Sequence, residues 1–294
     1  MPENLTALYQ TLAKKVLPYI AKEGRVYTQI EGLSFYRHDN PHYSLPCVQP
    51  LGVVVALQGR KEISLGDETI SYDVGQILFV GANLSGFAYM PECSAENPFL
   101  GLALEFDFNQ LSHLACELDL NNKESTKNAP NRIFSLFDAN EKLLESLSRL
   151  VDTLQEGALI QPIAELIKQE IALRIFHAHP ELVELLKDGT ATHKIIETMA
   201  WMKQHPQAKN SLASLAERTL MSESAFRQHF RTIAGISPMQ FQKQLRLQQA
   251  RMLILQEKRA IAEAASLVGY ESPSQFSREY KRFFGVTAQE DRLE

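Results

Sequence analysis

The stretches at residues 211–231, S-L-A-S-L-A-E-R-T-L-M-S-E-S-A-F-R-Q-H-F-R, and 260–285, A-I-A-E-A-A-S-L-V-G-Y-E-S-P-S-Q-F-S-R-E-Y-K-R-F-F-G, repeat one plan about fifty residues apart. Each begins with a short apolar helix and a tight turn. Each continues with a helix that opens with serine and carries arginine. Two such units in one chain predict a helix-turn-helix motif that occurs twice.

In the first copy, helical spacing separates an inner face from an outer face. Leu212, Leu215 and Ala216 recur at i, i+3 and i+4, which predicts one apolar face of a short helix. Phe226 and Phe230 share the inner face of the next helix. The polar residues left on its outer edge are Ser224, Arg227, Gln228 and Arg231. Arg and Gln form bidentate hydrogen bonds with base edges in the major groove, so this edge is a candidate DNA-reading surface.

The second copy divides in the same way. Ser272 is placed to cap a helix whose first residue is Pro273, and Phe276 and Tyr280 point inward. The outward residues are Ser274, Gln275, Arg278, Lys281 and Arg282. A solvated helix face explains one such edge alone about as well as DNA binding does. Two matching edges favour DNA binding. Lys281 and Arg282 are expected to contact phosphates.

A long polar helix is predicted between the two copies, from about Pro238 to Gln256. About eighteen helical residues span roughly 27 Å. Such a helix can hold two recognition helices about one turn of DNA, roughly 34 Å, apart on one face of the duplex.

With these motifs in place, the segment resembles the DNA-binding domain of the AraC/XylS family of transcription regulators. The matching residues are Gly235-Ile236-Ser237-Pro238, Arg246-Leu247, Ala250, Leu253, Ile261-Ala262, Ala265, Val268-Gly269-Tyr270, Ser274, Phe276-Ser277-Arg278, Lys281 and Phe284-Gly285. The resemblance implies double-stranded operator or promoter DNA and RNA polymerase as partners, activation of transcription, and a homodimer. The chain departs at Ala288 and Asp291, where the family usually has proline and an aromatic residue. We expect Asp291 to weaken a contact on the phosphate side.

Charge is distributed unevenly along the chain. The net charge of −5 by itself argues against a nucleic-acid binder. Residues 190–294, however, hold 15 Lys and Arg against 10 Asp and Glu, a net charge of +5. Residues 1–189 hold 15 against 25, a net charge of −10. A basic C-terminal segment joined to an acidic N-terminal one fits a DNA-binding domain with a separate regulatory domain.

The 294 residues are expected to form two domains. The predicted division is a sensor and dimerisation domain at 1–186, a linker at 187–192, and a DNA-binding domain at 193–294 with motifs at about 211–234 and 260–284. The first residues hold no uninterrupted apolar core of a signal peptide, and no stretch approaches the roughly twenty apolar residues of a membrane span. The protein is therefore expected to be cytoplasmic.

Between about residues 26 and 110 the pattern is that of short strands separated by glycine, proline and asparagine. The runs are Val26–Ile30, Leu33–Arg37, Gly52–Leu57, Glu62–Leu65, Thr69–Tyr72, Ile77–Val80 and Leu100–Phe106. This spacing predicts a sandwich or barrel. On residues 73–79, D-V-G-Q-I-L-F, the region resembles the cupin-like sensor domain of AraC-type regulators. The fold class is thus α+β in two domains.

Beyond a polar segment at 119–131, predicted as a loop, apolar residues recur with helical period. Helices are expected between about 138 and 180, including 160–177. By family resemblance we favour dimerisation through this helix pair. Packing within the protomer explains the same apolar stripes nearly as well.

Neither a cofactor nor a metal site is predicted. His38 and His42 lie four apart, but Asn40-Pro41 between them indicates a loop, and the strands from 52 to 80 hold no histidine. His113 and Cys116 are also taken as ordinary core or surface residues. No nucleophile elbow, phosphate-binding glycine loop or HExxH motif occurs, so an enzyme is not expected. The two alternatives kept open are a cupin-type enzyme and a ligand-independent DNA-binding protein.

The effector is predicted only as a small molecule or chemical signal. The widely spaced Cys47, Cys93 and Cys116 form neither a disulfide framework nor a CxxC metal pattern. They are candidate reactive thiols, on the condition that a nearby cation lowers their pKa. Inert core cysteines are the more common case.

Overall fold

The computed structural model describes residues 2–65, 68–121 and 133–293. The chain forms two compact units, residues 1–193 and 194–294. The helix that opens the second unit, α5 (Ala191–Gln204), begins within the segment predicted as the linker. Most of the segment 119–131, predicted as a loop, lies outside the described residues, and its first three residues end helix α2.

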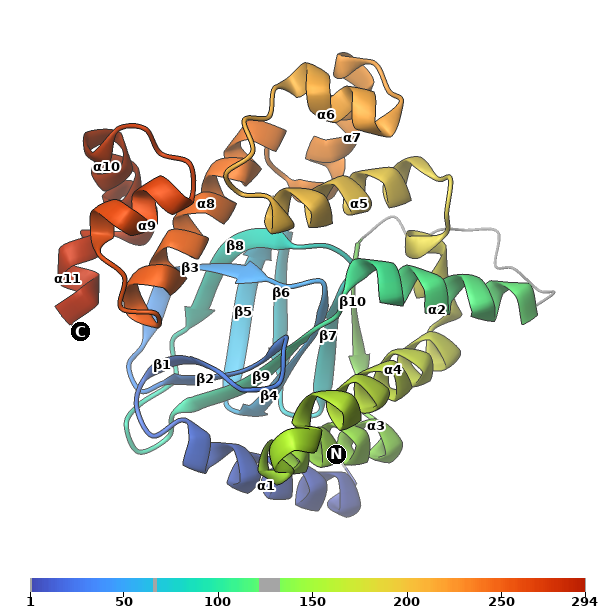
Figure 1. The fold of residues 1–294 in the computed structure, drawn as a ribbon. Coiled ribbons are helices and arrows are strands. Elements are labelled where there is room, and N and C mark those ends of the chain that lie inside the picture. The colour runs from blue at the N-terminus through green and yellow to red at the C-terminus, as the bar shows by residue number, and fades with distance from the viewer. Residues whose placement is uncertain (1, 66–67, 122–132, 294) are drawn as a thin grey trace. The chain divides into compact units, whose positions relative to one another are not determined.

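The N-terminal unit contains two antiparallel sheets (Figure 1). The six-stranded sheet has the order β1-β2-β9-β4-β7-β10 and the four-stranded sheet the order β3-β8-β5-β6. The strands of the first sheet are β1 (Gly24–Tyr27), β2 (Leu33–His38), β4 (Gly52–Gln58), β7 (Gln76–Val80), β9 (Phe99–Glu105) and β10 (Phe134–Asp138). Those of the second are β3 (His42–Gln49), β5 (Arg60–Leu65), β6 (Glu68–Asp73) and β8 (Leu84–Met90). The two sheets form a sandwich and not a closed barrel, which decides between the two predicted forms.

Helices cover the outer side of the larger sheet. They are α1 (Glu3–Val16), α2 (Phe108–Asn121), α3 (Glu141–Asp152) and α4 (Ile160–Ala178), with a 3₁₀ segment at Pro180–Leu186. In Figure 1, α1, α3 and α4 lie together, and α1 contacts both α3 and β4. None of the helices in the described part of the chain is long and apolar enough to cross a membrane.

Strands β4 and β9 are central and are covered on both faces. All residues from Gly52 to Leu57 and from Phe99 to Leu104 are buried. A strand with one face in water alternates apolar and polar residues, whereas a strand covered on both faces reads as a continuous apolar run. The sequence is apolar throughout these two runs because both faces of β4 and β9 are covered.

The sequence reasoning missed three strands, β3, β8 and β10. Pro46 lies in β3 and has no N–H to donate, so its run does not read as a strand. The structure places β3 at the edge of its sheet, where one unpaired side of the backbone tolerates proline. Gly86 in β8 weakens the strand signal in the same way.

The C-terminal unit is entirely helical (Figure 1). After α5 its helices are α6 (Leu212–Thr219), α7 (Glu223–Ala234), α8 (Pro238–Leu255), α9 (Ile261–Leu267), α10 (Pro273–Phe284) and α11 (Ala288–Leu293). The core of the second half includes Leu247, Ala265, Val268, Phe276 and Tyr280, all at most 3% exposed. The α+β fold with a helical C-terminal domain is thus confirmed.

The expectation for Asp291 was wrong. Its side chain is 3% exposed and points inward, where both oxygens accept hydrogen bonds at 2.8 Å from the guanidinium of Arg251. The Tyr280 hydroxyl donates a third hydrogen bond at 2.5 Å. Asp291 therefore fixes α11 to α8 and α10 and lies too deep to face a DNA phosphate.

Candidate nucleic-acid interface

The first helix-turn-helix is built from strong local signals at each helix end. Ser211 and Ser214 form a capping box at the start of α6. Leu220 ends α6 in the left-handed conformation, with φ of 57°, which makes the turn tight. The Ser222 hydroxyl then accepts a hydrogen bond from the Ala225 amide and starts α7. The turn between α6 and α7 thus orients α7 by its own backbone geometry.

Helix α7 has an inner face of aromatic residues and an outer face of polar ones. Phe226 and Phe230 are fully buried, and their ring centroids lie 5.6 Å apart. The rings anchor the helix, and they leave the opposite side free to meet a partner. The four predicted side chains, Ser224, Arg227, Gln228 and Arg231, are all exposed.

The second motif repeats this arrangement on α10. Ser272 caps the helix by accepting from the Gln275 amide, and Pro273 is its first residue. Phe276 and Tyr280 are buried. All five predicted residues, Ser274, Gln275, Arg278, Lys281 and Arg282, are exposed.

Gln275, one of the α10 residues predicted to contact DNA, has a hydrogen-bond partner within the protein. The side-chain amide of Gln275 donates to Glu279 at 3.3 Å. Glu279 also accepts a hydrogen bond at 2.8 Å from the Tyr270 hydroxyl and pairs with Lys243 of α8 at 3.1 Å. Burial acts to raise the pKa of Glu279, but the hydrogen bonds from Tyr270, Lys243 and Gln275 outweigh it and lower the pKa. An ionised Glu279 therefore holds Gln275 in place on the outer face.

Helix α8 joins the two motifs, and both α7 and α10 contact it (Figure 1). Arg246 donates from α8 to the carbonyl oxygens of Pro206 at 2.7 Å and Ala208 at 3.0 Å. Gln242 donates to the same Ala208 carbonyl at 2.8 Å. Sequence reasoning assigned no role to these two polar side chains. They fix the loop before α6 to the central helix, so the first motif is held on the same frame as the second.

The environment of the candidate thiols favours the unreactive form. Burial raises the pKa of the Cys47 thiol, and the nearby Lys61 and Arg25 offset this only in part. Burial also raises the pKa of Cys93, whose sulfur lies 2.8 Å from the Asn40 carbonyl oxygen. All three cysteines are free. Because the thiolate is the reactive species, the structure speaks against Cys47 and Cys93 as sensors at neutral pH.

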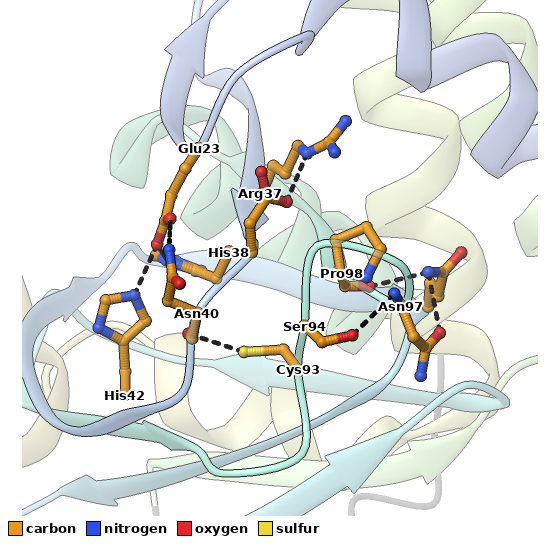
Figure 2. A network of polar contacts seen from close by, with 11 residues as sticks. Glu23, Arg37, His38, Asn40, His42, Cys93, Ser94, Asn97 and Pro98 are labelled. Carbon is orange, nitrogen blue, oxygen red and sulfur yellow. Dashed lines mark hydrogen bonds and ion pairs between the residues drawn. The ribbon is translucent and has the colours of Figure 1, made fainter.

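A second cluster lies outside this interface, in the N-terminal unit. The loop between β2 and β3 brings His38 and His42 together, and both face Glu23 (Figure 2). His38 is a core residue and His42 is partly exposed, and the sequence reasoning did not foresee that both would meet Glu23. Residues four apart across a tight loop are spatial neighbours, and the glutamate comes from a distant part of the sequence.

The comparisons with known proteins agree with the two units. A family model described as the AraC-type transcriptional regulator N-terminus matches residues 29–180, just over half of the chain. A helix-turn-helix domain model matches residues 215–293. The chain belongs to the AraC-type transcriptional regulators. It binds DNA through its helix-turn-helix domain, and its family consists of regulators and not enzymes.

Relatives extend over most of the chain. The "Probable transcriptional regulator LumQ" of Photobacterium leiognathi is 23% identical over 266 residues, which cover 90% of this chain and 93% of LumQ. The virulence regulon transcriptional activator VirF of Yersinia enterocolitica is 23% identical over 244 residues, which cover 82% of this chain and 89% of VirF. Both alignments span the sensor-like and the helical units together.

Among solved structures, ToxT from Vibrio cholerae shares the fold. ToxT bound to (E)-4-(8-methylnaphthalen-1-yl)but-3-enoic acid has a TM-score of 0.67 and 14% identity, with 89% of this chain and 97% of ToxT covered. At this identity the likeness concerns the fold alone.

Proposed function

We propose that this AraC-type regulator is an activator that reads operator DNA through the outer faces of α7 and α10. The observation that carries the proposal is the matched pair of exposed faces on one frame, each with an arginine one turn beyond the helix start, at Arg227 and Arg278. Activation is supported by the relative VirF, described as a transcriptional activator. The proposal includes action in the cytoplasm and contact with RNA polymerase.

Genome-wide footprinting of the full chain in its native host tests this function. The expected result is a small set of promoters with a shared motif, whose transcripts fall when the gene is deleted. Unselective binding spread along the chromosome, or transcripts that rise on deletion, would contradict a sequence-specific activator. A chain carrying the Arg60→Ala change serves as control, because Arg60 is an exposed arginine of β5 paired with Glu62 and lies outside the interface.

Lys281 and Arg282 are proposed to contact phosphates. We expect Lys281→Ala and Arg282→Ala each to weaken binding to every sequence alike, because a phosphate contact carries no base information. Each loss should reduce the slope of log affinity against log salt by about 0.9. Fluorescence anisotropy across a salt series measures this slope. An unchanged slope in both variants would remove these residues from the phosphate contacts.

We further propose that the N-terminal unit binds a small acidic effector. Lys61 of β5 is only 3% exposed, and its ammonium group lies over the rings of Tyr36 at 5.3 Å and Phe99 at 5.7 Å. Burial lowers its pKa. Of the neighbouring groups that act on this pKa, Cys47 opposes the shift and Arg25 adds to it. Within the described part of the chain, no carboxylate is among them. A buried cation without a counter-charge suits an anionic ligand, and ToxT is described in complex with a carboxylic acid.

A ligand-independent DNA-binding protein is the second candidate, and one observation favours it. Lys61 is only 3% exposed, whereas the hollows lined by residues of α8 and α10 lie in the C-terminal unit. An acidic effector must therefore open the sandwich in order to reach Lys61.

Thermal-shift measurements with a panel of small carboxylic acids separate the two candidates. The wild type is expected to be stabilised by at least one acid, and Lys61→Met to lose that response. Lys22→Met, at an exposed position, should retain it. If no acid raises the melting temperature of the wild type, the result contradicts an acidic effector and supports a ligand-independent DNA-binding protein.

We propose that the regulator forms a homodimer through α4. Leu159, Leu166 and Leu173 recur every seven residues and are exposed by 55%, 67% and 37%. Apolar residues at heptad spacing typically pack against an identical helix. We expect Leu166→Asp to shift the protein from dimer to monomer in size-exclusion chromatography with light scattering. Leu17→Asp, at another exposed leucine, should leave the mass unchanged; a monomeric wild type would contradict the proposal.

A further inference from the structure

Three side chains from separate segments converge at one edge of the N-terminal unit (Figure 2). Glu23 precedes β1, His38 ends β2 and His42 begins β3. One ligand atom from each lies within 4.8 Å of the other two. His42 Nε2 is 2.8 Å and His38 Nδ1 is 3.7 Å from the same oxygen of Glu23, Oε1. The two imidazole rings lie edge to face, with centroids 4.8 Å apart.

His38 is the most constrained of the three. It is 7% exposed, and among the described residues its Nδ1 has no hydrogen-bond partner. A buried polar atom without a partner normally costs about 1–3 kcal/mol, so its presence calls for an explanation. Burial, assisted by the positive charge of Lys61, lowers the pKa of His38 to about 3.

The carboxylate is held in position by its own partners. Asn40 donates from Nδ2 to Glu23 Oε2 at 2.7 Å, which leaves Oε1 directed at the two histidines (Figure 2). The thiol of Cys93 in turn donates to the Asn40 carbonyl oxygen at 2.8 Å. Burial acts to raise the pKa of Glu23, but hydrogen bonds from His42 and Asn40 outweigh it and lower the pKa. Outer partners of this kind are typical of metal ligands, whose orientation they fix.

We propose that Glu23, His38 and His42 bind a divalent transition-metal ion, with Zn²⁺ as the best fit. Zn²⁺ binds histidine nitrogen and carboxylate oxygen at about 2.0–2.2 Å in tetrahedral geometry, which places neighbouring ligand atoms roughly 3.3–3.5 Å apart. The distances of 2.8 and 3.7 Å lie on either side of that value. The third pair of ligand atoms, one nitrogen from each imidazole, lies within 4.8 Å, so the two rings must move closer together to form the site.

The ligand set also limits what the ion does. Two histidines and one carboxylate leave a fourth tetrahedral position open, in contrast to closed structural sites with four protein ligands. Imidazole favours Zn²⁺ and its transition-metal neighbours over Mg²⁺ and Ca²⁺, which prefer all-oxygen sites. Because the three ligands come from three segments, a bound ion links the start of β1 to the loop between β2 and β3. Metal binding is thus expected to stabilise the N-terminal unit independently of DNA and of any acidic effector.

Isothermal titration of the untagged, metal-stripped full chain with ZnCl₂ tests this site. We expect one ion per chain, and a melting temperature that rises with Zn²⁺ but not with Mg²⁺. Glu23→Gln and His42→Ala, both at partly exposed positions, should abolish this binding while circular dichroism remains native. Asn40→Ala, which removes an outer partner, should weaken affinity by about 10–100-fold. Substitution with Co²⁺ should give the visible absorption of a tetrahedral site in the wild type and not in Glu23→Gln or His42→Ala.

His113→Ala is the matched control. His113 faces Glu117 on α2 at 3.7 Å, but both are well exposed and no third ligand joins them in the described residues. This variant should bind Zn²⁺ as the wild type does. The proposal is overturned if the wild type takes up no Zn²⁺, or if Glu23→Gln and His42→Ala bind it with unchanged stoichiometry and affinity. Loss of the ion in His113→Ala alone would place the site on α2 instead.

Discussion

The double variant Arg227→Ala/Arg278→Ala is expected to bind its operator about 2–6 kcal/mol more weakly than the wild type. Each arginine on an exposed recognition face accounts for about 1–3 kcal/mol, and the losses add because the two residues act in separate motifs. Both side chains lie opposite buried aromatic residues, so their removal leaves the core intact. Each single variant should also relax base preference at one position of the operator. Quantitative gel shift with an operator library measures both effects.

Two comparisons make this result specific. Arg60→Ala removes an exposed arginine from the N-terminal unit and should leave operator affinity unchanged. The double variant should also bind random DNA nearly as well as the wild type does, since most phosphate contacts remain. If the double variant retained wild-type affinity and selectivity, the assignment of base contacts to these helices would be wrong.

Asp291→Ala is expected to destabilise the C-terminal unit by about 2–4 kcal/mol. Removing one partner of a buried ion pair costs about 3–5 kcal/mol, and the partial exposure of Arg251, whose side chain is 34% exposed, reduces that figure. The variant also leaves the buried Tyr280 hydroxyl without its hydrogen-bond acceptor. Burial and the hydrogen bond to Asp291 raise the pKa of this hydroxyl. A shift on the order of 10 °C or more follows for a unit of this size. Thermal unfolding followed by circular dichroism at 222 nm measures it.

The matched control for Asp291 is an exposed ion pair in the same unit. Glu271 pairs with Lys209 at 2.7 Å, but their side chains are 80% and 86% exposed. Water and salt screen such a pair, so Glu271→Ala should hardly change the melting temperature. Equal melting temperatures for Asp291→Ala and the wild type would show that α11 contributes nothing to the stability of this unit.

The sequence predicted the helix-turn-helix pair well because its signals are local. Serine caps, a proline at the first helical position and glycines at helix ends each act within a few residues. Ser272 caps its helix as predicted, Ser222 and Ser237 cap theirs in the same way, and Gly235 and Gly285 end their helices with positive φ. Buried and exposed faces followed from helical spacing alone. The exposure of all nine proposed DNA-contacting side chains therefore rests on the same local pattern.

The features that could not be predicted from the sequence depend on contacts between segments that are distant in the chain. Asp291 reads as a surface carboxylate until Arg251, forty residues earlier, is seen to pair with it. Glu23 is fifteen residues from His38, and only the pairing of β1 with β2 brings them to one edge. Pro46 conceals an edge strand, because edge position is a property of the sheet and not of the segment. Spacing within one element could not have found any of these.

Hydroxyl-radical footprinting of the full chain on its operator tests the central claim most directly, namely that α7 and α10 read DNA together. Because α8 contacts both α7 and α10, we expect the two helices to occupy two major-groove segments on one face of the duplex. Protection should therefore occur at two places about one helical turn, roughly 10 base pairs, apart. Arg227→Ala should weaken protection of one segment and Arg278→Ala that of the other. A single protected segment, or a footprint that both variants leave unchanged, would contradict the account.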